Sequence, residues 1–191
     1  MCAPDAPEPL QTLASVRISQ TRLEDARSAL RRSLDMWENL PPEDSEIPDF
    51  PTRVSLARLL MEAGLEEKAI SVLERLVQED DTSVEAWYLG GWCLYLIAQQ
   101  QGAMEQNGSE QKEVLADHEH IVRSRKWLLK ALKLYGKLEY EDDRLKEHAE
   151  ELVAELNRTL GEPQEGEEEE EEPSWEDVDE DEGEDEDMQN A

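Results

Sequence analysis

Three large aromatic side chains at helical spacing, near the middle of the chain, are the residues best placed to do chemistry. Tyr88, Trp92 and Tyr95 follow one another at intervals of four and three residues, so they share one stripe of an α-helix. Tyrosine and tryptophan combine a large apolar area with one polar edge and are frequent among the residues that dominate binding at interfaces. The stripe predicts recognition of an extended peptide. The alternative is that the three rings pack against a neighbouring helix as ordinary core.

The other reactive side chains form no pattern that predicts catalysis or metal binding. His118 and His120 are two residues apart and so lie on different sides of a helix, and neither has a metal-ligand spacing to His148. We find no glycine-rich phosphate loop, no Gly-x-Ser-x-Gly turn and no cysteine in a recognisable catalytic context. We therefore expect a non-enzyme without metal or cofactor. Ser174, which precedes Trp175 and two acidic residues, is a candidate site for an acid-directed kinase.

The aromatic stripe lies within a 34-residue repeat. Residues 50–83 and the run that follows them align at this spacing, which places Trp87 and Gly91 on the tryptophan and glycine of the tetratricopeptide signature W-x2-L-G-x2-Y. Gly64 falls at the turn between the two helices of the first copy. The repeat predicts an all-α, tetratricopeptide-repeat-like α-solenoid of antiparallel helix pairs, which is a binding scaffold.

The chain divides into a helical repeat domain at 10–161 between two segments expected to be disordered, an N-terminus at 1–9 and an acidic tail at 162–191. The predicted parts of the domain are, in chain order, a degenerate helix pair at 10–40, a repeat at 50–83, a second repeat at 84–136, and a capping helix at 139–160. The second repeat carries an insertion at 99–117 that we expect to form a surface loop, because the second-helix pattern resumes after it. A capping box formed by Thr82 and Glu85 is expected to open this repeat.

The first helix of each tetratricopeptide pair lines a concave groove through fixed repeat positions. In the two aligned repeats these positions select the candidate partner-binding residues Val54, Arg58, Met61, Glu62, Glu85, Tyr88, Trp92 and Tyr95. Trp87 stands outside this set, and we expect it to pack between helices.

Acidic residues dominate the composition and are concentrated at one end. The formal net charge is −30, and the tail holds 18 acidic residues and no Lys or Arg, which leaves −12 on residues 1–161. Phosphates of nucleic acids and anionic membranes repel such a surface, whereas a basic protein is attracted to it. We therefore expect a basic partner, no direct nucleic acid binding and no membrane. The alternative is that the acidic tail serves solubility alone.

Targeting and redox features are sparse. Cys2 and Cys93 are far apart, no apolar signal segment opens the chain, and no stretch approaches 18 continuous apolar residues. This pattern predicts a reduced, intracellular protein without a membrane span.

Three stretches, Ser15–Gln20, Pro51–Glu62 and Val84–Leu96, resemble the fungal assembly chaperones dedicated to large-subunit ribosomal protein L-four, and the resemblance runs from about Leu13 to Leu160. It implies a superhelix that captures the long basic loop of the newly made ribosomal protein, keeps the protein soluble and escorts it from cytoplasm to nucleus.

The resemblance also implies that further repeats precede the matching point, so that this chain corresponds to the C-terminal part of the family's chain. A repeat stack without its neighbours exposes apolar surface, here near Leu10, Leu13 and Leu23, which predicts self-association.

A function of a different class is an adaptor that docks peptide segments of other proteins, as the heat-shock co-chaperone repeats do. Those repeats clamp a carboxylate with Lys and Asn side chains in the groove. Here Val54, Arg58, Tyr88 and Trp92 stand in the groove positions, which favours the chaperone.

Overall fold

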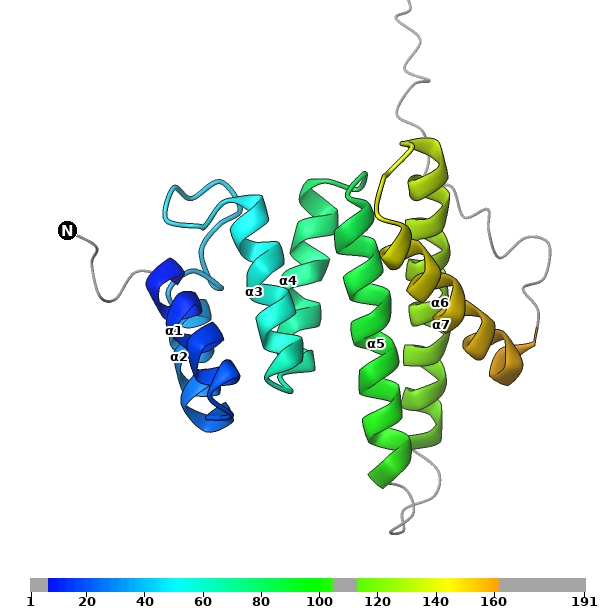
Figure 1. Cartoon of the computed structure of the whole chain (residues 1–191), viewed down its shortest axis with the longest axis horizontal. Coiled ribbons are helices and arrows are strands. Elements are labelled where there is room, and N and C mark those ends of the chain that lie inside the picture. Colours follow the sequence, from blue (N-terminus) through cyan, green and yellow to red (C-terminus); the bar gives the residue numbers. More distant parts are fainter. Residues whose placement is uncertain (1–6, 105–112, 162–191) are drawn as a thin grey trace, which may run out of the picture.

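The chain folds into helices that pack as successive antiparallel pairs (Figure 1). The computed structural model describes residues 7–104 and 113–161. Their helices are α1 (Pro7–Ser19), α2 (Leu23–Asp35), α3 (Phe50–Glu62), α4 (Glu66–Glu79), α5 (Val84–Met104), α6 (Glu113–Lys137) and α7 (Asp143–Leu160). The pairs α1/α2, α3/α4 and α5/α6 follow one another along the molecule, and α7 packs on α6. The predicted fold class, an all-α solenoid of helix pairs with a final capping helix, is confirmed.

The first pair, predicted at 10–40, turns at Thr21, whose φ of 59° lies in the left-handed region. Its first helix begins earlier than predicted, at Pro7, within the segment 1–9 for which no helix was expected. Proline is suited to the first turn of a helix, and the Ser33 hydroxyl of α2 donates a 3.0 Å hydrogen bond to the Pro7 carbonyl. Leu10, buried against the core, adds apolar contact to this first turn.

Each repeat starts at a side-chain cap. The Asp49 carboxylate accepts a 3.0 Å hydrogen bond from the Thr52 amide at the start of α3. Hydrogen bonding by the Thr52 side chain, followed by that of its amide, lowers the pKa of Asp49. At the start of α5 the Ser83 hydroxyl accepts from the Ala86 amide at 3.3 Å. The predicted Thr82–Glu85 capping box is therefore wrong by one residue, because the Thr82 hydroxyl donates instead to the Asp80 carboxylate at 2.6 Å.

The predicted loop at 99–117 is largely helical. Helix α5 continues to Met104 and α6 begins at Glu113, so the insertion lengthens both helices of the hairpin, and 105–112 lie outside the described residues. Gln99, Gln100 and Gln101 are good helix formers and contain no stop signal. A 3.2 Å hydrogen bond between Gln101 Oε1 and His120 Nδ1 joins the two extended helices.

Two adjacent glycines let α5 and α6 approach closely. A Cβ on Gly91 would lie 2.6 Å from Leu128 Cγ, and a Cβ on Gly90 would overlap the Trp127 ring. The buried Ser124 hydroxyl donates a 2.7 Å hydrogen bond to the Gly91 carbonyl across the same contact. Glycine therefore fills the small-residue positions of this repeat for a steric reason.

The capping helix begins four residues later than predicted, at Asp143. Glu139 has a φ of 50°, which a helix interior does not accommodate, and the Asp142 carboxylate caps α7 by accepting from the Leu145 amide at 3.1 Å. The helix buries one apolar face, formed by Leu145, Ala149, Leu152 and Leu156. Gly161, with a φ of 81°, ends it.

The predicted acidic tail lies beyond the described residues. Among those residues no helix combines the length and apolarity needed to cross a membrane.

Candidate partner-binding surface

The predicted groove residues of the two repeats meet at an ion pair between α3 and α5. Arg58 Nη2 lies 2.6 Å from Glu85 Oε1, and the Arg58 side chain is 55% exposed. The pair lies at the surface, where a single ion pair adds little to stability because water screens it. Its two charges stay available to a partner.

The aromatic stripe of α5 packs against the capping helix. Tyr88 and Trp92 have ring centroids 6.1 Å apart, and His148 of α7 stacks edge-on against both, at 5.9 Å from Tyr88 and 5.0 Å from Trp92. The Tyr88 hydroxyl and His148 Nδ1 form a 2.8 Å hydrogen bond. Burial raises the pKa of Tyr88, which is 8% exposed. This ring is therefore a structural contact between α5 and α7.

The same helix continues along the stripe to Tyr95. A hollow of about 160 Å³ lies between α5, α6 and α7, lined in part by Tyr95, Glu155 and Leu156. The Tyr95 hydroxyl accepts a 2.6 Å hydrogen bond from Gln99. Desolvation, followed by the hydrogen bond and negative charge of Glu155, raises the pKa of Tyr95 to about 12.

The structure thus divides the predicted groove residues by exposure. Three are buried, namely Val54, Met61 and Tyr88; three are half-buried, namely Glu85, Trp92 and Tyr95; and two are exposed, namely Arg58 and Glu62. The alternative that the aromatic rings pack as ordinary core fits Tyr88. Trp92, Arg58 and Glu85, in contrast, keep part of their surface exposed to solvent. Trp87 packs between helices, with its ring 4.7 Å edge-on from that of Trp127.

Two residues near this surface were missed by the sequence argument. Tyr140, in the turn between α6 and α7, is 37% exposed. Desolvation, followed by the negative charge of Glu85, raises the pKa of its phenol, and the positive charge of Arg58 opposes this shift. His148 contacts the stripe directly. Neither lies at a groove position of an aligned repeat, so the repeat pattern gave no signal for them. We call Arg58, Glu85, Trp92, Tyr140 and His148 together the α3–α5–α7 surface.

The cysteine and histidine side chains outside this surface show no arrangement for catalysis or metal binding among the described residues. Burial raises the pKa of the Cys93 thiol to about 12, and its S–H donates to the Glu66 carbonyl at 3.3 Å, so it stays protonated and inert. His118 is exposed and His120 bonds to Gln101. Among the described residues no three His, Cys, Asp or Glu side chains gather to hold a metal ion.

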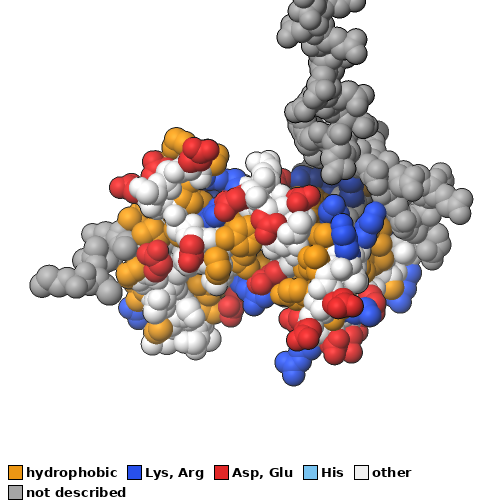
Figure 2. All heavy atoms as spheres, turned by 90° about the horizontal axis from the view of Figure 1, so that it is seen from above, with side chains coloured by type: hydrophobic (Ala, Val, Ile, Leu, Met, Phe, Trp, Pro, Cys, Tyr) orange, Lys and Arg blue, Asp and Glu red, His pale blue; other side chains and the backbone are white. Residues whose placement is uncertain are grey.

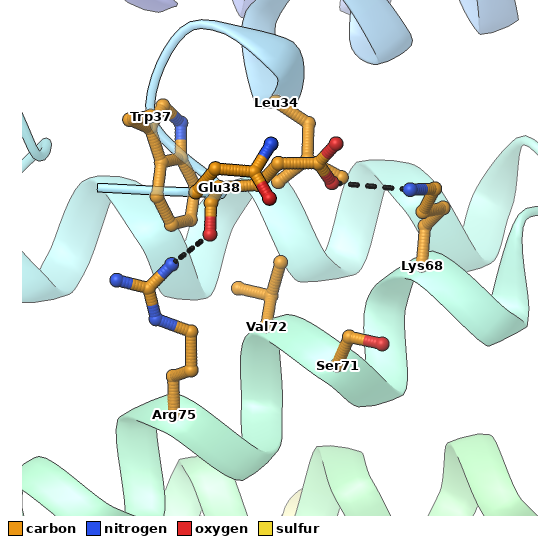
Figure 3. A pocket seen from close by; sticks show the side chains of 8 residues that line it. Leu34, Trp37, Glu38, Lys68, Ser71, Val72 and Arg75 are labelled. Carbon is orange, nitrogen blue, oxygen red and sulfur yellow. Dashed lines mark hydrogen bonds and ion pairs between the residues drawn. The ribbon is translucent and has the colours of Figure 1, made fainter. Parts of the chain in front are cut away.

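A second hollow, of about 250 Å³, lies between the end of α2 and α4 (Figure 3). Its charged groups are used within the chain: Arg75 donates to the Glu38 carbonyl at 2.7 Å and lies over the Trp37 ring, and Lys68 pairs with the Glu38 carboxylate at 3.0 Å. These contacts bind the chain after α2 to α4, which gives the hollow a structural role.

Comparison with known proteins places the chain in a family. The chain is 57% identical over 164 residues to a protein of Emericella nidulans named "Probable assembly chaperone of rpl4", and 38% identical over 162 residues to a protein of Schizosaccharomyces pombe with the same name. The chain is a homologue of these assembly chaperones. The matched regions cover 85% and 84% of it. The resemblance predicted from the sequence is confirmed.

A solved structure agrees with the sequence matches. The chain named "Assembly Chaperone of RpL4 (Acl4) (Residues 1-338)" superimposes with a TM-score of 0.53 at 56% identity, over 54% of this chain and 36% of that one. No family model matches the sequence. The chain spans less than half the length of the curated relatives, 43% and 46%.

Proposed function

We propose that this chain is a non-catalytic chaperone that binds a newly made basic ribosomal protein of the large subunit, of the rpl4 type. The observation that carries the proposal is its 57% identity, over 85% of its length, to a protein named as the assembly chaperone of rpl4. In this function the chain holds the client's extended basic loop, keeps the client soluble and delivers it for large-subunit assembly, moving between cytoplasm and nucleus.

The geometry supports peptide binding on the α3–α5–α7 surface. Trp92 offers a half-buried ring, Tyr140 an exposed ring, and Arg58 and Glu85 a pair of opposite charges. An aromatic anchor beside exposed charges suits a basic segment, because Lys and Arg stems lie on rings while their charges meet a carboxylate. Residues 1–161 carry a net charge of −12, which attracts such a segment over a distance.

Self-association remains a separate proposal. Leu13 and Val16 on α1 and Leu23 at the start of α2 are at least 40% exposed, whereas Leu10, which was expected to be exposed, is buried. The exposed three offer an apolar face to a second copy of the chain.

A sedimentation assay tests the chaperone function. We expect purified rpl4-type protein to pellet when it is diluted alone into physiological salt and to stay in the supernatant with the full chain at equal molarity. A matched basic protein that is not ribosomal is the control. If the client pellets to the same extent with and without the chain, the proposal is wrong.

A further inference from the structure

Helix α6 carries an unusual feature for so acidic a chain, which is a continuous basic stripe. Five of its residues recur at intervals of three and four and so share one helical face: Arg123, Lys126, Lys130, Lys133 and Lys137. No acidic side chain occurs in α6 between Arg123 and Lys137. In the view from above, Lys and Arg side chains gather toward the end of the molecule that α6 and α7 occupy (Figure 2).

The stripe is exposed for most of its length. Arg123 pairs with Glu74 of α4 at 2.7 Å and Lys130 lies 5.9 Å from the centre of the Trp87 ring, so these two are partly engaged. Lys126, Lys133 and Lys137 are exposed, and for Lys133 and Lys137 there is no carboxylate partner within the described part of the chain. Concentrated positive charge of this kind repels itself unless an anion neutralises it.

The contacts at the end of α7 anchor the start of the acidic tail to α6, the helix that carries the stripe. The guanidinium of Arg125, on α6, donates a 2.8 Å hydrogen bond to the Gly161 carbonyl and lies 3.4 Å from the Asn157 amide oxygen. Gly161 is the last described residue, and the next 30 residues carry 18 acidic side chains and no basic one. The acidic tail therefore leaves the fold from a point tied to α6, one residue away from Lys126.

Length and tethering favour contact between the two. Fourteen residues separate Arg123 from Lys137, which along a helix is about 21 Å. About seven extended residues cover that distance, so the tail can follow the whole stripe. Because it is tethered, the tail acts on the stripe at an effective concentration on the order of millimolar.

We propose that the acidic tail, Glu162–Ala191, docks on the basic stripe of α6. The tail lies along the stripe as an extended polyanion held by charge, and its binding weakens as salt shortens the range of electrostatic attraction to about 3 Å at 1 M. Nucleic acid phosphate is the competing occupant by charge alone. The net charge of −30 works against it, because the tail and the acidic remainder of the fold repel a second polyanion.

Paramagnetic relaxation in the full chain tests this docking. A nitroxide is attached at Ser174→Cys in a Cys2→Ser background, and the buried Cys93 thiol does not compete for the label. We expect the label to broaden amide signals of α6 from Lys126 to Lys137 at low salt, to leave α1 and α2 sharp, and to lose its effect at about 1 M salt.

Two variants with the same change in net charge test whether the stripe is the site where the tail docks. Lys126→Gln, Lys133→Gln and Lys137→Gln combined should abolish the broadening, whereas the same charge change at exposed Arg22, Arg31 and Lys68 should leave it intact. Circular dichroism checks that both variants remain folded.

Three results would overturn the proposal: no selective broadening of α6, broadening that survives the stripe variant, or broadening that appears only between a labelled chain and a separate isotope-labelled copy. Displacement of the label from α6 by an equimolar ribo-oligonucleotide would assign the stripe to nucleic acid instead.

Discussion

Single residues set how closely the helices of this solenoid approach. Gly91 lies against Leu128 with no room for a methyl group, whereas Gly136, also in a helix, has no atom within 4 Å of the position that a Cβ would take. Both glycines are thus helical but differ in their surroundings. The repeat signature specifies the first of them, and the structure supplies the reason.

A pair of alanine substitutions tests this steric argument. Gly91→Ala should lower the free energy of unfolding by about 1–3 kcal/mol, because the new methyl group forces α5 and α6 apart. Gly136→Ala should leave it unchanged or raise it by up to about 1 kcal/mol, since alanine favours the helix. Urea unfolding of both variants gives the comparison. Equal effects at the two positions would contradict the close contact between α5 and α6.

The raised pKa of Tyr95 predicts that the folded chain loses stability in alkali. Its pKa is about 12 in the folded chain against 10.0 for an ordinary tyrosine, so the folded state keeps the phenol proton to a higher pH than the unfolded state does. The stabilising contribution is therefore complete below pH 10 and is lost as the pH rises through 12. We expect Tyr95→Phe to reduce the fall in thermal midpoint between pH 9 and 12. A fall as steep as in the unmodified chain would be evidence against this shift.

At the scale of elements, α7 is both the cap of the repeat stack and the cover of the aromatic stripe. His148 couples it to α5 through one hydrogen bond and two edge-on ring contacts. The position of α7 decides which part of the stripe reaches a partner: Tyr88 is covered, and Trp92 is partly open.

A double-mutant cycle measures this coupling. His148→Ala should cost about 1–3 kcal/mol of unfolding free energy, because the buried Tyr88 hydroxyl loses its partner. Once Tyr88→Phe has removed the hydroxyl, the same His148 substitution should cost less. Chemical denaturation of the two single variants and the double variant gives the interaction energy. Strictly additive costs would show that the hydrogen bond does not couple the helices.

The sequence predicted the helix pairs well where the 34-residue pattern is regular. Gly64 turns with a φ of 69°, and Trp87 packs between helices, as their repeat positions required. The segment 99–117 was predicted as a loop because it departs from the repeat, but departure from a pattern says nothing about local helix propensity. The helical Gln99–Gln101 run shows the difference.

The candidate site was harder to predict than the fold. Groove positions in a repeat are defined by a complete superhelix, and at the last repeat they face whichever element follows. Here that element is α7, whose His148 covers Tyr88. The sequence predicted a capping helix here, and α7 buries Leu145, Ala149, Leu152 and Leu156, but nothing in the sequence indicated that its histidine would meet the aromatic stripe.

At the scale of the whole molecule, charge is the dominant property. The net charge of −30 predicts fast, salt-sensitive association with a basic client, because long-range attraction raises the encounter rate. In stopped-flow mixing, the association rate with an rpl4-type protein should fall at least about tenfold between 0.05 and 0.5 M salt, while the dissociation rate changes less. A rate insensitive to salt would exclude electrostatic steering.

An equilibrium titration shows whether the α3–α5–α7 surface binds a basic ribosomal protein, as we propose. Purified rpl4-type protein is titrated into the full chain, into Trp92→Ala, and into Leu138→Ala, whose side chain is 48% exposed in the turn before α7. We predict saturable binding that Trp92→Ala weakens about tenfold, or about 1.4 kcal/mol, and that Leu138→Ala leaves unchanged. Absence of saturable binding, or equal affinity of the Trp92 variant and the unmodified chain, would contradict the claim.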